Sequence, residues 1–191
     1  MSLEFNRRSF LKYSAAAAVA VAGSSLLVGC GEDEYQKTGK IGSTLKLMGT
    51  FKTYKSAVEP TKAPAYDATN NTFTCTVNIK CTTKKVPLCV NNGCFELTVT
   101  NDDGKKNYAG SSHINVSPTI LDLYESDDAQ DFTITVTGTT DNPLNITAGD
   151  TVEFKYWPRI QASSGNSGYT RAFCTWKMTA KAGNPSGIVL E

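Results

Sequence analysis

The chain has 191 residues, and its 19 basic and 18 acidic side chains give a formal net charge of +1 at pH 7. Balanced charge provides no basic face of the kind that binds nucleic acid, so we expect no nucleic-acid partner. After residue 29 no apolar run is long enough to span a bilayer. The part of the chain that follows has the size of one ordinary domain.

The N-terminal segment carries an export pattern. Arg7 and Arg8 precede Phe10-Leu11-Lys12, and residues 13–29 are apolar but rich in Ala, Gly and Ser. That stretch is too short and too weakly apolar for a membrane-spanning helix. The arrangement resembles a twin-arginine export signal, with Asn6 in place of the usual Ser or Thr. The alternative interpretation is a signal-anchor helix that is never cleaved.

The segment Leu27-Val28-Gly29-Cys30 resembles the lipobox of bacterial lipoproteins. The resemblance implies that Cys30 is acylated and becomes the mature N-terminus. It also implies a lipid-anchored location, on the outer face of the cell membrane or on a membrane facing the periplasm. We assign residues 1–29 to a twin-arginine lipoprotein signal peptide, 30–41 to a polar tether and 42–191 to a β-sandwich domain.

Alternation of apolar and polar residues dominates the mature chain and predicts an all-β fold. The clearest predicted strand is 73–81, in which every odd position is apolar and every even position is polar. Val86, Leu88 and Val90 repeat the pattern before Asn92-Gly93, which favours a type I′ turn. We therefore expect a hairpin in which 86–90 pairs with 95–99.

The same alternation and the intervening turn residues predict further strands at 45–47, 106–109, 113–117, 119–124, 131–137, 152–156 and 169–180. About eight or nine short strands in one domain predict a β-sandwich. A Gly149-Asp150-Thr151-Val152 strand start, a glycine-rich loop and a final aromatic strand resemble the immunoglobulin-like, telokin-like domains of bacterial lipoproteins. That resemblance spans residues 42 to 181 and implies a fold rather than a function.

Five cysteines follow the lipobox, and none forms a Cys-x-x-Cys motif. Their spacing misses zinc-ribbon and ferredoxin patterns, so we predict core packing or a disulfide, no metal and no cofactor. Cys89 and Cys94 flank a turn and are the best disulfide pair. Cys75 and Cys81 share the apolar face of one strand about 20 Å apart and are expected to stay unbridged. Because five is odd, at least one thiol is unpaired or intermolecular.

The sequence contains no recognisable catalytic motif, and we expect no enzyme activity. The chain has one histidine, His113, without a Gly-x-Ser-x-Gly nucleophile motif. A blue-copper centre needs two histidines beside a cysteine, so Cys174 and Met178 are predicted to be core residues. The acidic segment 125–131 lacks the spacing of a formed calcium loop and is predicted to be a solvated connection.

Trp157 and Arg159, next to the Ser/Gly-rich loop 161–168, form the predicted binding site, because aromatic and Arg side chains make good anchors. The sequence therefore predicts a membrane-tethered, non-catalytic binding module for an unknown protein or small ligand. The alternative is a redox or metal-carrying accessory protein that is exported already folded. That alternative rests on the export route and on the number of cysteines.

Overall fold

The computed structural model describes residues 36–48, 55–81, 88–118, 122–123, 129–161, 167–169, 172–183 and 187–191. The export signal, the lipobox with Cys30 and most of the predicted calcium-loop and Ser/Gly-loop segments lie outside these ranges. Regular structure in the described part consists of β-strands and one short 3-10 helix. None of the described helical structure is long and apolar enough to cross a membrane.

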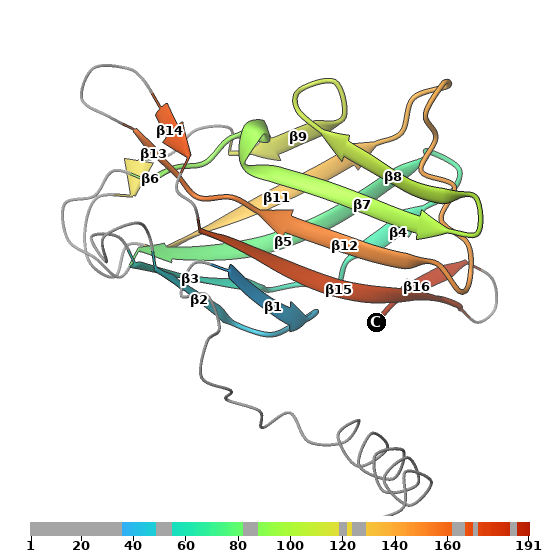
Figure 1. Ribbon diagram of the computed structural model, residues 1–191, viewed down its shortest axis with the longest axis horizontal. Helices are drawn as coiled ribbons and strands as arrows, with labels where there is room; N and C mark the ends of the chain where they lie inside the picture. The colour runs from blue at the N-terminus through green and yellow to red at the C-terminus, as the bar shows by residue number, and fades with distance from the viewer. Residues whose placement is uncertain are drawn as a thin grey trace, which may run out of the picture. The chain divides into compact units, whose positions relative to one another are not determined.

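As far as the structure describes the chain, the main sheet has 12 strands and folds into two layers, and five of its strands form the layer that we call the first sheet (Figure 1). In spatial order they are β1 (Gln36–Lys40), β15 (Phe173–Ala182), β12 (Thr151–Tyr156), β7 (Phe95–Asn101) and β8 (Gly104–Ala109). β1 runs parallel to β15, and the other neighbours are antiparallel. Phe154 lies opposite both Trp176 and Leu97, which fixes the register at the centre of the sheet.

The second sheet lies behind the first in Figure 1. In spatial order its strands are β9 (Ile114–Ser117), β11 (Ala129–Thr137), β5 (Thr72–Cys81), β3 (Lys55–Pro60) and β2 (Leu45–Met48). β4 (Ala65–Asp67) continues the edge of β5 that β3 begins, and β16 (Ile188–Leu190) links β4 to β15. The order β3-β5-β11-β9 facing β15-β12-β7-β8 is that of an immunoglobulin-like sandwich, so the predicted fold class is confirmed.

The core lies between the two sheets. The inward faces of β5, β7, β12 and β15 are buried as the alternation predicts. The rings of Phe73 and Phe154 meet across the layers with centroids 5.7 Å apart. Trp176 is fully buried, and its indole N–H donates to the Ser43 carbonyl at 3.0 Å. A buried donor that finds an acceptor in this way carries little desolvation cost.

The predicted hairpin is wrong. Leu88–Cys89 forms β6 of a small separate sheet, where it pairs with β10 (Asp122–Leu123) and β13 (Arg159–Gln161). β13 also pairs with β14 (Ser167–Tyr169). Both edges of β7 are occupied by β12 and β8, so no edge is left for a hairpin partner. Residues Asn92–Cys94, expected as a tight turn, form the 3-10 helix η3 instead.

Part of the predicted tether is a strand. Residues 36–40 form β1, which is held by backbone pairing to β15 and has alternating exposed and half-buried side chains. The predicted last strand, 169–180, is observed as β15 over Phe173–Ala182 with residue 169 in β14. The strand β3, over Lys55–Pro60, was not predicted.

Candidate functional site

The turn at residues 91–94 collects the residues that the sequence analysis singles out. The Asn91 side chain caps η3 by accepting from the Gly93 N–H at 3.0 Å. The same oxygen accepts from Arg159 Nη1 at 3.2 Å. The Trp157 N–H donates to the Cys94 carbonyl at 2.7 Å. Cys89, Cys94, Trp157 and Arg159 are therefore all placed around Asn91.

The two thiols of this turn are buried. Cys94 is a free thiol that lies 3.5 Å from the Cys89 carbonyl oxygen, and the Asn91 amide Nδ2 lies 3.5 Å from Cys89 Sγ. Burial raises the pKa of Cys94 to about 12, although the Asn91 N–H and the Arg159 charge oppose the shift. The Cys94 thiol is therefore protonated near neutral pH, which disfavours nucleophilic attack by its sulfur. A Cys89–Cys94 bridge stays a prediction.

The remaining cysteines behave as core residues. Cys75, Cys81 and Cys174 are buried in the core cluster. Burial raises the pKa of Cys75 to about 12 and that of Cys174 well above its ordinary value. Within the described ranges, no three His, Cys, Asp or Glu side chains are grouped so that they could hold a metal ion.

Trp157 and Phe173 form an aromatic pair on the outer face of the first sheet. Both side chains are partly exposed, and their ring centroids lie 4.5 Å apart. The Lys155 ammonium lies 5.2 Å from each ring centroid and 3.9 Å from Glu96 Oε1. We call Lys155, Trp157 and Phe173 the aromatic patch. A depression of about 480 Å³ adjoins it, and Trp157 lines that depression together with Gly93, Phe95, Glu96, Ala109 and Gly110.

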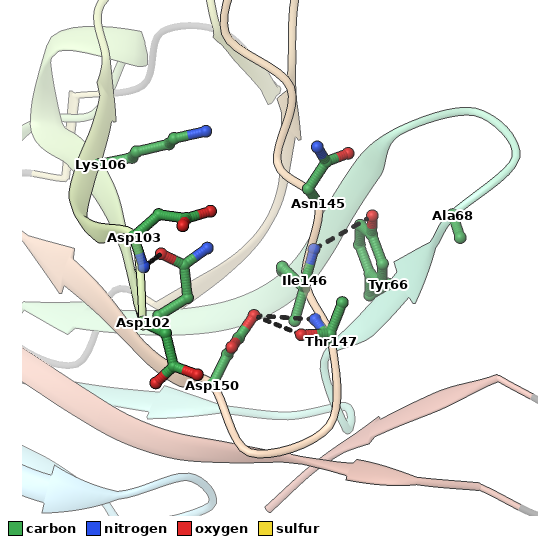
Figure 2. A pocket seen from close by; sticks show the side chains of 10 residues that line it. Tyr66, Ala68, Asp102, Asp103, Lys106, Asn145, Ile146, Thr147 and Asp150 are labelled. Carbon is green, nitrogen blue, oxygen red and sulfur yellow. Dashed lines mark hydrogen bonds between the residues drawn. The ribbon is translucent and has the colours of Figure 1, made fainter.

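A larger, polar pocket of about 640 Å³ lies at the opposite ends of β7 and β12 (Figure 2). None of its residues was predicted as a site. Ten residues line it, namely Tyr66, Ala68, Asn101, Asp102, Asp103, Lys106, Asn145, Ile146, Thr147 and Asp150. In Figure 2, Asp103 and Lys106 lie on one side of the pocket, with Asn145 and Tyr66 on the other.

Local hydrogen bonds fix the walls of this pocket. Asp150 Oδ2 accepts from the Thr147 N–H at 2.8 Å and from its hydroxyl at 3.2 Å. The Ile146 N–H donates to the Tyr66 hydroxyl at 3.3 Å, which joins the β11–β12 connection to β4. Asn145 adopts a φ of 42°, in the left-handed region that Asn tolerates better than most residues. The polar side chains are thus presented by constrained backbone.

The pocket was missed because its parts come from three separate segments of the chain. The segments Asn101–Asp103 and Asn145–Asp150 each look like an ordinary polar turn in the sequence. They meet only because β7 and β12 pair, with Thr100 opposite Thr151. The local signal that could have suggested a site is the excess of Asp and Asn in both turns.

A family model for the twin-arginine translocation pathway signal sequence matches residues 4–24. The chain therefore carries this signal, which directs export across the cytoplasmic membrane to the cell envelope or periplasm. A search of curated proteins finds no match.

Three solved structures are similar in part. A secreted protein of Mycobacterium tuberculosis, MPT63, is 15% identical, with a TM-score of 0.40 over 75% of this chain and 98% of that one. The putative ApaA protein of Bordetella pertussis is 15% identical, with a TM-score of 0.36 over 64% and 93%. The sporulation control protein Spo0M of Bacillus subtilis is 12% identical, with a TM-score of 0.32 over 69% and 50%.

Proposed function

We propose that this exported protein is a lipid-tethered, non-catalytic binding module whose ligand site is the polar pocket. The Leu27-Val28-Gly29-Cys30 segment directly after the export signal supports the lipid anchor. The observation that carries the binding role is the pocket itself, about 640 Å³ of space with polar side chains on constrained turns. Pockets of this volume are the usual size for small-molecule sites.

The lining favours a small polar ligand that is rich in hydrogen-bond donors. Asp102, Asp103 and Asp150 contribute carboxylates, and Lys106 contributes the one cation of the lining. Acceptors therefore outnumber donors, and the pocket carries net negative charge. The half-buried ring of Tyr66 offers an apolar surface beside these groups. Hydroxyl groups of a sugar or amino groups of a small amine match this arrangement.

The alternative is a redox or metal-carrying accessory protein. Burial raises the pKa of Cys75 and Cys94 to about 12, which argues against a role of these two residues as reactive thiolates. Of the two predicted contact residues, Trp157 follows the other end of β12 and belongs to the aromatic patch, whose separate role is argued below. Arg159 lies on β13 and donates to the Asn91 side chain.

Saturation-transfer NMR with two probe sets, neutral monosaccharides and linear polyamines, tests the pocket. We expect at least one set to bind and to lose binding in Asp103→Ala, since Asp103 faces the pocket. Lys105→Ala is the matched control, because Lys105 is exposed on the same strand as Lys106 but does not line the pocket. Binding that survives Asp103→Ala unchanged, or binding by neither set, contradicts the proposal.

A further inference from the structure

The aromatic patch lies beside the point where the folded domain begins. β1 runs parallel to β15, and its first residue, Gln36, pairs with Phe173. On the other edge of β15, Tyr156 pairs with Cys174, so Trp157 comes level with Phe173. Neighbouring strands are about 4.8 Å apart, which places the backbones of Gln36 and Trp157 about 10 Å from each other. The patch therefore adjoins the entry of the N-terminal segment.

The chain between Cys30 and this entry is short. Only residues 31–35 separate Cys30 from Gln36. An extended chain spans at most about 3.6 Å per residue, so Gln36 lies within about 22 Å of Cys30. An acylated Cys30 would sit at the lipid surface. A tether of this length keeps the Gln36 end of the sandwich, and the aromatic patch with it, close to that surface.

The chemistry of the patch suits the region of lipid headgroups. Trp side chains gather at membrane interfaces, because the indole ring is apolar while its N–H group is polar. The Lys155 ammonium lies over the Trp157 and Phe173 rings. The ammonium can therefore bind lipid phosphates while the rings contact the region where headgroups meet acyl chains. Among the described residues, Lys155 forms an ion pair with Glu96. The distance of 3.9 Å between Lys155 Nζ and Glu96 Oε1 is long for such a pair.

We propose that the aromatic patch docks on the headgroup region of the membrane that holds Cys30. This inference rests on the proposed lipid anchor, and it assigns the lipid headgroups as the partner of the aromatic patch. Docking there also orients the domain. The polar pocket adjoins Thr151, which lies six residue steps of extended chain before Trp157. The pocket thus lies about 20 Å from the aromatic patch along β12, at the other end of the sandwich.

Fluorescence quenching in vesicles tests the docking. The mature protein is purified from host membranes, its acylation is checked by intact mass, and it is reconstituted into phosphatidylethanolamine and phosphatidylglycerol with bromine near the headgroup end of the acyl chains. The chain has two tryptophans, and Trp176 is fully buried in the core. We expect bromine to quench most of the Trp157 emission. In Trp157→Phe the remaining emission is expected to stay unquenched.

A reporter at the far end provides the matched control. Ala68 is exposed at the rim of the polar pocket, and Ala68→Trp in the Trp157→Phe background moves the reporter there. We expect this reporter to remain unquenched. Acylated protein whose Trp157 is not quenched, or an equally quenched reporter at position 68, overturns the docking and leaves the anchor intact. An unacylated N-terminus in the intact mass overturns the anchor and the docking together.

Discussion

Replacing Asn91 with Ala tests whether one side chain holds the turn at residues 91–94. The Asn91 carboxamide oxygen accepts from the Gly93 N–H and from Arg159 Nη1, and its Nδ2 contacts Cys89 Sγ. Losing an N-cap costs about 1 kcal/mol. Losing a hydrogen bond to a charged group costs about 1.5–3 kcal/mol, and the lower value applies because Asn91 and Arg159 are both partly exposed. We expect the free energy of unfolding to fall by about 2–3 kcal/mol.

Urea unfolding followed by circular dichroism measures this change. The urea concentration at the midpoint should fall. The dependence of the free energy of unfolding on urea concentration should stay the same, because the surface exposed on unfolding is little altered. Asn91→Asp keeps the accepting oxygen and should retain most of the stability. Asn92→Ala, one residue along, should lie within about 0.5 kcal/mol of the parent protein. A loss below about 0.5 kcal/mol for Asn91→Ala, or an equal loss for Asn91→Asp, would refute the assignment.

Two further predictions concern the thiols and the export signal. In the reduced protein, the pKa of Cys75 and Cys94 is raised from 9.0 to about 12 by folding, so between these values the unfolded chain gives up protons that the folded one keeps. Stability should be unaffected by these thiols below pH 9 and should fall above it, by up to about 1.4 kcal/mol per pH unit for each thiol. Urea midpoints measured from pH 8 to 11 check this. The decrease of the midpoint with pH should be shallower in Cys75→Ala, which lacks one of the two thiols. Changing both Arg7 and Arg8 to Lys should block export in cell fractionation, whereas unchanged export would indicate the general secretory route.

The sequence predicts the buried strands well and their partners poorly. Alternation identifies the strand at Thr72–Cys81 and its inward face because one side of β5 is buried along its whole length. Alternation does not say which strand lies alongside, so Phe95–Asn101 was assigned to the wrong partner. Around residues 91–94 the Asn91 side chain caps η3, and this stabilises the 3-10 helix over the tight turn that Asn92-Gly93 favours.

Sequence analysis does not predict strands that are held by backbone pairing alone. β1 has no buried side chain, and its pairing to β15 depends on main-chain groups that every residue possesses. The polar pocket was missed for a related reason, since Tyr66, Asp103 and Asn145 come from segments that are distant in the chain. In contrast, Trp157 and Arg159 could be selected from the sequence because a large aromatic and a cation stand together at a strand end.

Mass spectrometry of the N-terminal peptide from the native host tests the central claim, a domain tethered to lipid through Cys30. We predict a mature N-terminus at Cys30 whose mass is increased by a thioether-linked diacylglyceryl group, because the segment 27–30 resembles a lipobox. Treatment with a base that cleaves acyl esters should remove most of that added mass. An unmodified mature N-terminus at another residue would contradict the claim.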